Sequence, residues 1–380
     1  MKYNFKKYFL YFIAMLLIQC LGCKKNADSN DNEQFNSGNE NISINIAGQQ
    51  KKIYFSFNKI TTDIVERVWG KIELKRLIKI GGIENQTLLK PSRIKVDNKG
   101  NIYILDIAES SVKKFSSTGL FIKKYGQKGK GPGEFTRAYD FDIDTTGKIA
   151  VLGPNEGKFS VFYDDTVIES KSKLLPIELC FASKSEVATL QIMDPLSYSP
   201  ISKTNFKEGK ELNYNNFLSK KSFEGENYGM LPFLIGDIHR YQLDKLVYIS
   251  SIMGYVVLYD DNGNIISVFK LINTAHQSAL RKREDKIKGS DFPLVRFPRK
   301  DEYLFMCTNI WGDNLYVFSD YSNKNEDNYV IDVYSISNER YKYSFNLSGI
   351  GKIVSVFITK SKIYIIKLNT EALVYNYVTD

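Results

Sequence analysis

From residue 51 onward the chain alternates short apolar runs with short polar turns in one recurring unit. Residues 96–106 and 143–153 show the unit most clearly, with an apolar run, a tight turn containing Asp and Gly, and a second apolar run; the two copies begin 47 residues apart. Such runs predict β-strands, and Asp and Gly suit the turns because Asp bonds its own backbone and Gly accepts positive φ. Weaker copies begin near residues 182, 243, 311 and 358.

A second hairpin follows most copies of this unit. Asn262-Gly263 lies between two apolar runs after the fourth copy, and Thr118-Gly119 occupies the same place after the first. Asn-Gly between apolar strands is typical of a tight hairpin. Two consecutive hairpins make four antiparallel strands, and four-stranded units that repeat about every 40–70 residues predict the blades of a β-propeller.

Six copies predict an all-β protein, a six-bladed β-propeller of four-stranded antiparallel blades over residues 51–380. The last copy ends at residues 375–378, before a complete outer strand. The apolar strand at 72–78 can supply the missing one, so we expect the ring to be closed by an N-terminal strand. A seventh blade over 51–80 would lack the Asp/Gly turn, and packed β-sandwiches are the other architecture that this strand spacing allows.

A glycine-rich segment separates the first two copies. It contains Gly126, Gly129, Gly131, Pro132, Gly133 and Glu134. The segment resembles the inter-blade linker of the NHL-repeat and TolB-like propellers, the six-bladed β-propeller lipoproteins of bacteria; the resemblance is close over residues 91–163 and rests on strand rhythm elsewhere. This resemblance implies that the segment is a structural linker between two blades. A phosphate-binding loop would need Walker spacing or a dinucleotide fingerprint that opens a helix, whereas a strand follows here.

The first 22 residues have the features of a lipoprotein signal peptide. Residues 1–7 are basic and 8–18 are uninterruptedly apolar, a run shorter than the roughly 20 residues that a bilayer-spanning helix needs. Leu21-Gly22 before Cys23 resembles a bacterial lipobox, in which the cysteine is lipidated and becomes the mature N-terminus. Residues 23–50 are polar and predict a flexible tether.

We therefore expect Cys23 to anchor the propeller to a membrane of the bacterial cell envelope. Lys24 and Lys25 stand where an inner-membrane retention aspartate would be. This favours an outer-membrane lipoprotein that faces the periplasm or the cell surface.

The charge balance is mildly basic. Lys and Arg number 52 against 43 Asp and Glu, a formal net charge of +9, and removal of the signal peptide would lower it by three. The excess is spread along the chain, so we expect no nucleic-acid partner. Cys180 and Cys307 lie in apolar stretches, which favours two buried thiols over one long-range disulfide.

Few residues point to catalysis. His239 and His276 are the only histidines, which excludes a three-histidine zinc site and leaves no recognisable catalytic triad. We therefore assign no catalytic residue and no metal ligand. Carboxylates are numerous enough for calcium in a central channel, although several occupy turn positions: Asp97, Asp144, Asp260 and Asp261.

Residues 273–300 are the least blade-like segment and predict a helical insertion. Its basic residues form a cluster: Arg281, Lys282, Arg283 and Lys286. The cluster is either a contact for an anionic ligand or lipid headgroup, or a solvated helix face. Aromatic residues that are candidate platforms for sugar or peptide, with core packing as the alternative, are Trp69, Tyr198, Tyr228 and Trp311.

A propeller presents loops from every blade around one central funnel, a geometry that suits recognition. We therefore expect an exported, membrane-anchored lipoprotein whose propeller binds a protein, peptide or glycan without catalysis. The alternative is a calcium-dependent, lactonase-like hydrolase with a metal in the central channel. Oxygen ligands that converge there from several blades would favour the enzyme.

Overall fold

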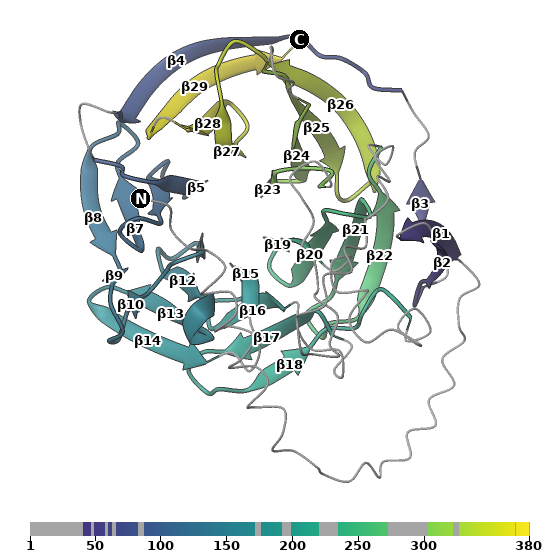
Figure 1. The fold of residues 1–380 in the computed structure, drawn as a ribbon, viewed down its shortest axis with the longest axis horizontal. Coiled ribbons are helices and arrows are strands. Elements are labelled where there is room, and N and C mark those ends of the chain that lie inside the picture. The colour runs from purple at the N-terminus through teal and green to yellow at the C-terminus, as the bar shows by residue number, and fades with distance from the viewer. Residues whose placement is uncertain are drawn as a thin grey trace, which may run out of the picture. The chain divides into compact units, whose positions relative to one another are not determined.

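Six antiparallel sheets are arranged in a ring around a central axis (Figure 1). The computed structural model describes residues 41–46, 49–57, 60–62, 66–82, 87–171, 176–191, 199–219, 235–272, 303–321, 327–368 and 370–379. These residues belong to one unit, Ser37–Asp380. The all-β, six-bladed architecture predicted from the sequence is confirmed.

Several predictions fall outside the described residues. They are the signal peptide over 1–22, Cys23 with most of the tether over 23–50, the helical insertion near 273–300 with Arg281, Lys282, Arg283 and Lys286, and the side chains of Tyr198, Tyr228 and His276.

The first three blades follow one another along the chain, and their strands pair in sequence order. Blade 1 consists of β5 (Pro91–Val96), β6 (Ile102–Asp106), β7 (Ser111–Phe115) and β8 (Phe121–Tyr125). Blade 2 consists of β11 (Asp140–Ile143), β12 (Ile149–Gly153), β13 (Lys158–Tyr163) and β14 (Thr166–Lys171). Blade 3 consists of β15 (Pro176–Phe181), β16 (Glu186–Gln191), β17 (Ile201–Asn205) and β18 (Glu211–Asn213).

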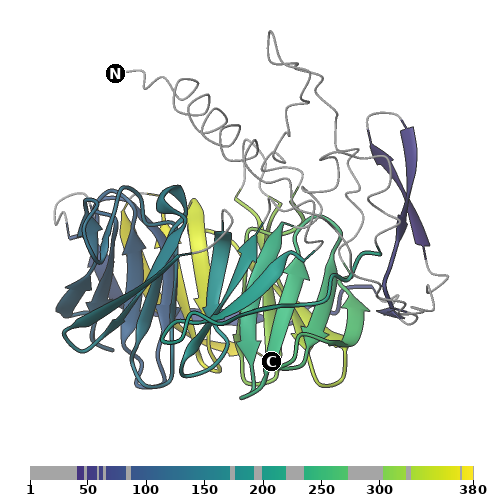
Figure 2. The ribbon, with the colours of Figure 1, turned by 90° about the horizontal axis from the view of Figure 1, so that it is seen from below.

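The other three blades complete the ring. Blade 4 consists of β19 (Gly236–Tyr241), β20 (Lys245–Ser250), β21 (Tyr255–Tyr259) and β22 (Ile265–Lys270). Blade 5 consists of β23 (Cys307–Trp311), β24 (Asn314–Asp320), β25 (Tyr329–Ser335) and β26 (Arg340–Leu347). Blade 6 consists of β27 (Ile353–Ile358), β28 (Lys362–Lys367), β29 (Glu371–Thr379) and β4 (Ile72–Gly81). Seen edge-on, the inner strands run between the two faces of the ring (Figure 2).

The Asp side chains of the predicted turns hold those turns locally. Asp97 Oδ1 accepts hydrogen bonds from the backbone N–H of Lys99 at 2.9 Å and of Asn101 at 2.8 Å. Asp144 and Asp260 accept the same pair of bonds from residues two and four positions ahead. Local side-chain-to-backbone bonds of this kind favour turns. They hold the inner hairpins of blades 1 and 2 at Asp97 and Asp144, and the outer hairpin of blade 4 at Asp260.

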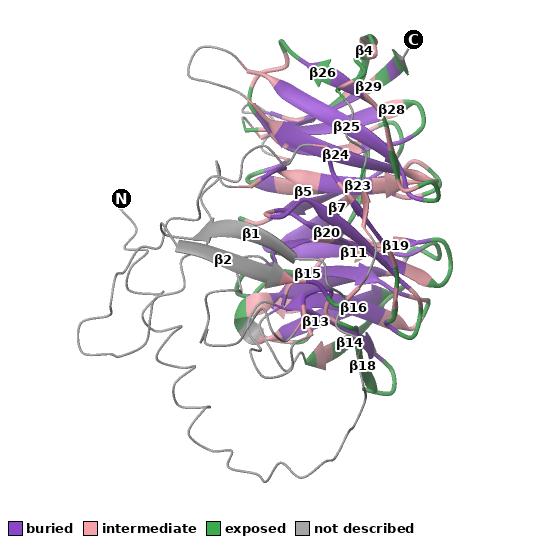
Figure 3. Cartoon of the chain, turned by 90° about the vertical axis from the view of Figure 1, so that its right-hand side faces the viewer, coloured by how far each residue is buried: buried purple, intermediate pink, exposed green. Residues whose placement is uncertain are grey.

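The apolar side chains form six buried clusters, each at the interface between two neighbouring blades. Val247 of blade 4 packs with Leu315 of blade 5, for example, and Ile104 of blade 1 packs with Ile366 of blade 6. The two middle strands of each blade are accordingly buried over most of their length (Figure 3), whereas outer strands such as β8 and β18 are exposed. Because each sheet covers its neighbour, the hydrophobic free energy depends on the ring being closed.

The closing strand is the one predicted. β4 pairs antiparallel with β29 over its whole length, with Ile80 opposite Ala372 and Ile78 opposite Val374. Figure 1 shows the N-terminal β4 running beside the C-terminal β29 on the outer edge of blade 6. The two ends of the propeller are therefore joined within one sheet.

The segment before β4 contacts three further blades, and we call its described residues, 55–57, 60–62 and 66–70, the N-terminal strap. Ser56 N–H donates to Phe217 O at 3.0 Å, beside blade 3. β3 (Thr61–Thr62) pairs parallel with β22 as a fifth strand of blade 4. Trp69 then forms a parallel bridge with Ser344 of blade 5. The sequence predicted only the last part of this path, the closing strand.

A hairpin precedes the strap. β1 (Asn41–Ile46) pairs antiparallel with β2 (Gln49–Tyr54). The hairpin extends across residue 50, where the sequence predicts the boundary between the tether and the propeller. In the described part of the chain the one helical element is the short 3₁₀ turn η2 (Pro154–Glu156), and no described helix is long and apolar enough to span a bilayer.

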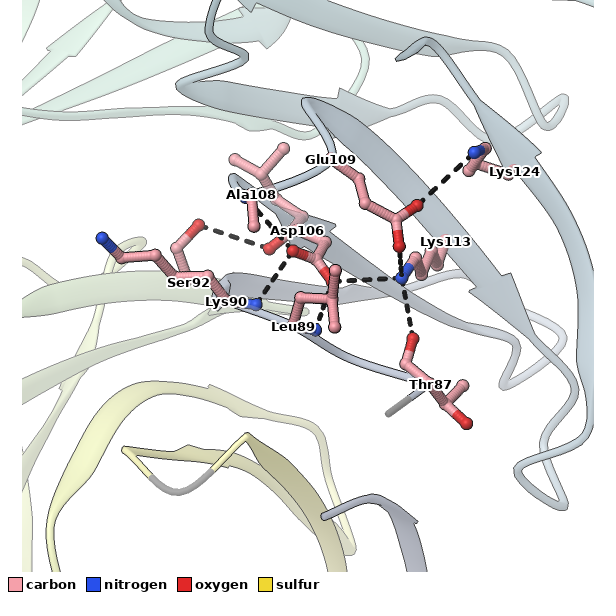
Figure 4. A network of polar contacts seen from close by, with 10 residues as sticks. Thr87, Leu89, Lys90, Ser92, Asp106, Ala108, Glu109, Lys113 and Lys124 are labelled. Atoms are coloured by element: carbon pink, nitrogen blue, oxygen red, sulfur yellow. Dashed lines mark hydrogen bonds and ion pairs between the residues drawn. The ribbon is translucent and has the colours of Figure 1, made fainter. Parts of the chain in front are cut away.

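A buried ion-pair network fixes the chain as it enters blade 1 (Figure 4). Lys113 Nζ lies 3.1 Å from Asp106 Oδ2 and 2.8 Å from Glu109 Oε1, and donates to Thr87 O at 2.7 Å. Burial alone would raise the pKa of Asp106, but the N–H of Leu89 and the ammonium of Lys113 hold that pKa below its ordinary value. The network ties the segment after β4 to strands β6 and β7.

Candidate ligand-binding channel

The inner strand of each blade turns alternate side chains toward the axis, because neighbouring residues of a strand point to opposite faces. These side chains form two levels. The first tier contains Arg93, Asp140, Glu178, Asp237, Cys307 and Ser355. The second tier contains Lys95, Asp142, Cys180, His239, Asn309 and Phe357. All of them except Asp140 line one opening of about 800 Å³.

The first tier gathers three carboxyl groups around one guanidinium. Arg93 Nε lies 3.3 Å from Asp140 Oδ1, and Arg93 Nη2 contacts Glu178 Oε1. Asp237 Oδ2 accepts hydrogen bonds from the backbone N–H and the hydroxyl of Thr308, both at 2.8 Å. In the part of the chain that the structure describes, nothing donates to Asp237 Oδ1. The first tier is therefore short of positive charge.

The pKa values reflect this shortage. Burial raises the pKa of Glu178 well above its ordinary value, and the charges of Asp140 and Asp237 add to the rise although Arg93 opposes it. Burial likewise raises the pKa of Asp237. Burial lowers the pKa of Arg93, but Asp140 and Glu178 outweigh it and hold that pKa well above its ordinary value. Arg93 is a permanent cation here.

The charges of the second tier are balanced. Lys95 Nζ lies 2.8 Å from Asp142 Oδ1, and Asp142 Oδ2 accepts the backbone N–H of Phe181 at 2.8 Å. His239 Nε2 lies 2.7 Å from Thr308 Oγ1. Because that hydroxyl donates its proton to Asp237, His239 Nε2 is the donor to it. Burial, with the nearby charges of Lys95 and Arg93, lowers the pKa of His239 to about 3, so the imidazole is neutral.

Both cysteines of the channel are free thiols, as predicted. Burial raises the pKa of Cys180 well above its ordinary value and that of Cys307 to about 12. Both line the opening; Cys180 is buried and Cys307 is partly buried. A thiol with a raised pKa is a poor nucleophile, so neither group is prepared for covalent chemistry.

The mouth of the channel lies at the inner-hairpin turns and is aromatic. Trp311, at the end of β23, meets Phe357 edge to face with ring centroids 6.4 Å apart, and Tyr241 also lines the opening. One cation and one carboxylate, Arg240 and Asp313, line the same region. The excess of carboxyl groups is therefore confined to the first tier.

The channel residues do not fit the calcium centre that the alternative function requires. Calcium takes six to eight oxygen ligands, usually several carboxylates. Here Arg93 and Lys95 already pair with the carboxylates of Asp140, Glu178 and Asp142. Among the described residues, no group of three His, Cys, Asp or Glu side chains comes together as a metal site.

The glycine-rich segment forms a tight linker between blades 1 and 2. Its two short strands, β9 (Gln127–Lys128) and β10 (Glu134–Phe135), pair parallel. Glu134 Oε2 accepts the backbone N–H of Lys130 at 3.0 Å and of Gly131 at 2.9 Å. A Cβ added at Gly129 would lie 2.0 Å from that oxygen. The carboxylate of Glu134 thus occupies the amides that a phosphate would need.

The structure brings together channel residues that sequence reasoning had not singled out. Of the residues considered from sequence, His239, Cys180 and Cys307 face the channel and Trp311 lies at its mouth. The charged groups of the two tiers were missed: Arg93, Lys95, Asp140, Asp142, Glu178 and Asp237. Their signal was present, because charged residues alternate with apolar ones in β5, β11 and β19.

The ring, the inter-blade clusters and the channel define the class of this protein, a six-bladed β-propeller. Residues 77–259 match the DUF5128 family model, which is described as a 6-bladed beta-propeller. No protein with a curated description matches the chain.

Solved structures of the same fold are distant in sequence. A Bacteroides fragilis NCTC 9343 protein, described as exported, aligns with a TM-score of 0.54 and 14% identity over 81% of this chain and 95% of its own. A DUF4221 member from Bacteroides vulgatus ATCC 8482 aligns with a TM-score of 0.54 and 11% identity over 81% of this chain and 98% of its own. Virginiamycin B lyase from Staphylococcus aureus aligns with a TM-score of 0.48 and 10% identity over 80% of this chain and 99% of its own. Such likeness shows the fold alone.

Proposed function

We propose that this protein is an exported, lipid-anchored binding protein whose channel holds a peptide segment through a basic side chain. The sequence around Cys23 supports export and anchoring in the outer membrane. The Bacteroides fragilis protein of the same fold is also described as exported. The channel supports binding as the task of the propeller.

The observation that carries this proposal is the charge of the first tier. Three carboxyl groups face one guanidinium, and Asp237 Oδ1 accepts no hydrogen bond from a described residue. Even a half-buried carboxylate without a cation is costly. A second guanidinium or an ammonium, brought by a ligand, would relieve that cost and complete the pairing.

The shape of the channel suits a basic side chain. The mouth offers Trp311 and Phe357, whose rings can pack against an aliphatic stem, while the first-tier carboxyl groups lie further from the turns along the inner strands. Arg and Lys carry an apolar stem and a charged end, the same order of chemistry. An opening of about 800 Å³ holds such a side chain with the adjoining backbone.

The histidine and the two thiols of the channel favour binding over catalysis. A general base works best with a pKa near the operating pH, whereas the pKa of His239 is about 3. The two thiols are protonated because burial raises their pKa values. None of these groups is tuned for proton transfer or nucleophilic attack at neutral pH.

Calorimetric titration tests this function with two matched peptides, Gly-Arg-Gly and its neutral analogue Gly-citrulline-Gly. The full chain in mild detergent should bind the arginine peptide and not the citrulline peptide. Asp237→Asn should weaken binding about tenfold, as expected for the loss of a charge-assisted hydrogen bond. The control is Asp165→Asn, a fully exposed carboxylate on blade 2, which should change nothing. Equal binding of both peptides, or of neither, would refute the proposal.

A further inference from the structure

A second hollow lies on the outer edge of the ring, away from the channel. It has a volume of about 670 Å³, and Trp69, Lys71, Glu73, Asn346 and Val378 line it. These residues come from the strap, from β4 and β29 of blade 6 and from β26 of blade 5. The hollow therefore sits where the N-terminal segment passes from blade 5 to blade 6.

The hollow presents an exposed indole on a rigid backbone. The Trp69 side chain is 55% exposed, although the backbone on both sides is fixed. Gly70 N–H donates to Ser344 O, and Ser344 N–H donates to Val68 O, both at 2.8 Å. Arg67, two residues before Trp69, pairs with the buried carboxylate of Asp332. Tryptophan is usually buried because its apolar surface is large, so an exposed tryptophan on a fixed backbone is unusual.

Polar groups with unused hydrogen-bonding capacity surround the indole. Lys71 and Glu73 are exposed and make no ion pair or hydrogen bond with a described residue. Asn346 Nδ2 donates to Asn328 Oδ1 at 2.8 Å, and no described residue donates to the amide oxygen of Asn346. One ammonium donor, one carboxylate acceptor and one amide acceptor thus face the hollow, and their charges cancel.

We propose that this hollow binds a neutral hexopyranose chain, with one sugar ring stacked on Trp69. A pyranose has an apolar C–H face, which packs on an indole, and an edge of hydroxyl groups that both donate and accept. Glu73 and Asn346 accept from those hydroxyls and Lys71 donates to them. An anionic polymer would meet the carboxylate of Glu73, and a peptide anchored by a basic side chain finds no charge excess here. The site is independent of the channel.

Tryptophan fluorescence tests this site selectively. Trp69 and Trp311 are the two tryptophans of the chain, so Trp311→Phe leaves Trp69 as the single reporter. The full chain carrying Trp311→Phe is titrated with maltotetraose, cellotetraose, mannotetraose and chitotetraose. At least one sugar should shift the Trp69 emission in a saturable way.

Calorimetry with the sugar that binds then compares variants in the otherwise native chain. Trp69→Ala should weaken the affinity about tenfold, the size of one aromatic stacking contact, and Glu73→Gln should weaken it severalfold at unchanged thermal stability. Asp237→Asn should leave sugar binding intact, which separates this site from the channel. The proposal is wrong if none of the four sugars shifts the emission, if Trp69→Ala binds as tightly as the native chain, or if Gly-Arg-Gly alone shifts the Trp69 emission.

Discussion

Arg67 Nε lies 2.9 Å from Asp332 Oδ1, and Arg67 Nη2 lies 3.0 Å from Asp332 Oδ2, so a bidentate pair joins residues 265 positions apart. Asp332 is fully buried inside blade 5 and also accepts the hydroxyl of Ser344. The strap therefore contributes a partly buried cation to a blade that it does not belong to.

Removal of this arginine should destabilise the propeller. Arg67→Ala leaves the Asp332 carboxylate buried without a cation, and we expect the free energy of unfolding to fall by about 3 kcal/mol. Urea unfolding measures this change. Arg76→Ala, an exposed residue of β4 without a described ion pair, should stay within about 0.5 kcal/mol of the native chain. Equal stability of the two variants would show that the Arg67 pair contributes little.

The attachment of the strap to blade 4 should also depend on a buried apolar side chain. Phe55 is 1% exposed and meets Tyr255 edge to face, with ring centroids 5.1 Å apart. Phe55→Ala should lower the unfolding free energy by about 3–5 kcal/mol, because it opens a cavity between the strap and blade 4. Leu243→Ala, at a side chain that is 81% exposed, is the matched control. An unchanged thermal midpoint for Phe55→Ala would mean that the strap is not part of the folded unit.

His239 should make stability fall with acidification. Its pKa is about 3 in the folded chain against an ordinary value of 6.5. Between these two pH values the unfolded chain binds a proton that the folded chain does not, so the free energy of unfolding falls as pH falls from 6.5 toward 3. The free energy of unfolding falls by about 1.4 kcal/mol per pH unit where His239 is protonated in the unfolded chain and neutral in the folded chain.

His239→Gln removes this contribution, and the comparison is made by urea unfolding at a series of pH values. The native chain should lose stability relative to the variant across that window and not above pH 7. The raised pKa of Glu178 makes the free energy of unfolding rise as pH falls, which is the opposite effect. Glu178 is present in both the native chain and the variant, so the difference between their unfolding free energies reports His239. Parallel curves would contradict a neutral, half-buried His239.

The lipid anchor makes a separate prediction. Cys23→Ala should shift the protein from the membrane fraction of the producing cells to the soluble fraction, because a diacylated thiol is the proposed attachment. Fractionation followed by immunoblotting measures this. A variant that stays with the membrane would argue against lipidation at Cys23.

The blades could be predicted because their turns are encoded locally. Asp97, Asp144 and Asp260 bond their own backbone within four residues, so the sequence pattern and the structure coincide at these positions. The closing strand was predictable for a related reason: the last copy lacks an outer strand, and an apolar segment near the N-terminus was unassigned.

The strap and the channel could not be predicted in the same way. Phe55 and Arg67 act through partners about 200 or more residues away, and no local pattern encodes such a contact. Asp237 and Glu178 look like ordinary polar residues of half-exposed strands until the ring places them around Arg93. Trp69 and Trp311 were recognisable as candidate platforms, but only the fold separates one at the channel mouth from one on the outer edge.

The most direct measurement of the central claim is a crystal structure of the chain saturated with Gly-Arg-Gly. We predict that the peptide guanidinium lies within hydrogen-bond distance of Asp237 Oδ1, with its aliphatic stem against Trp311 or Phe357. A saturated complex in which the peptide lies elsewhere and the first tier is unchanged would contradict the account.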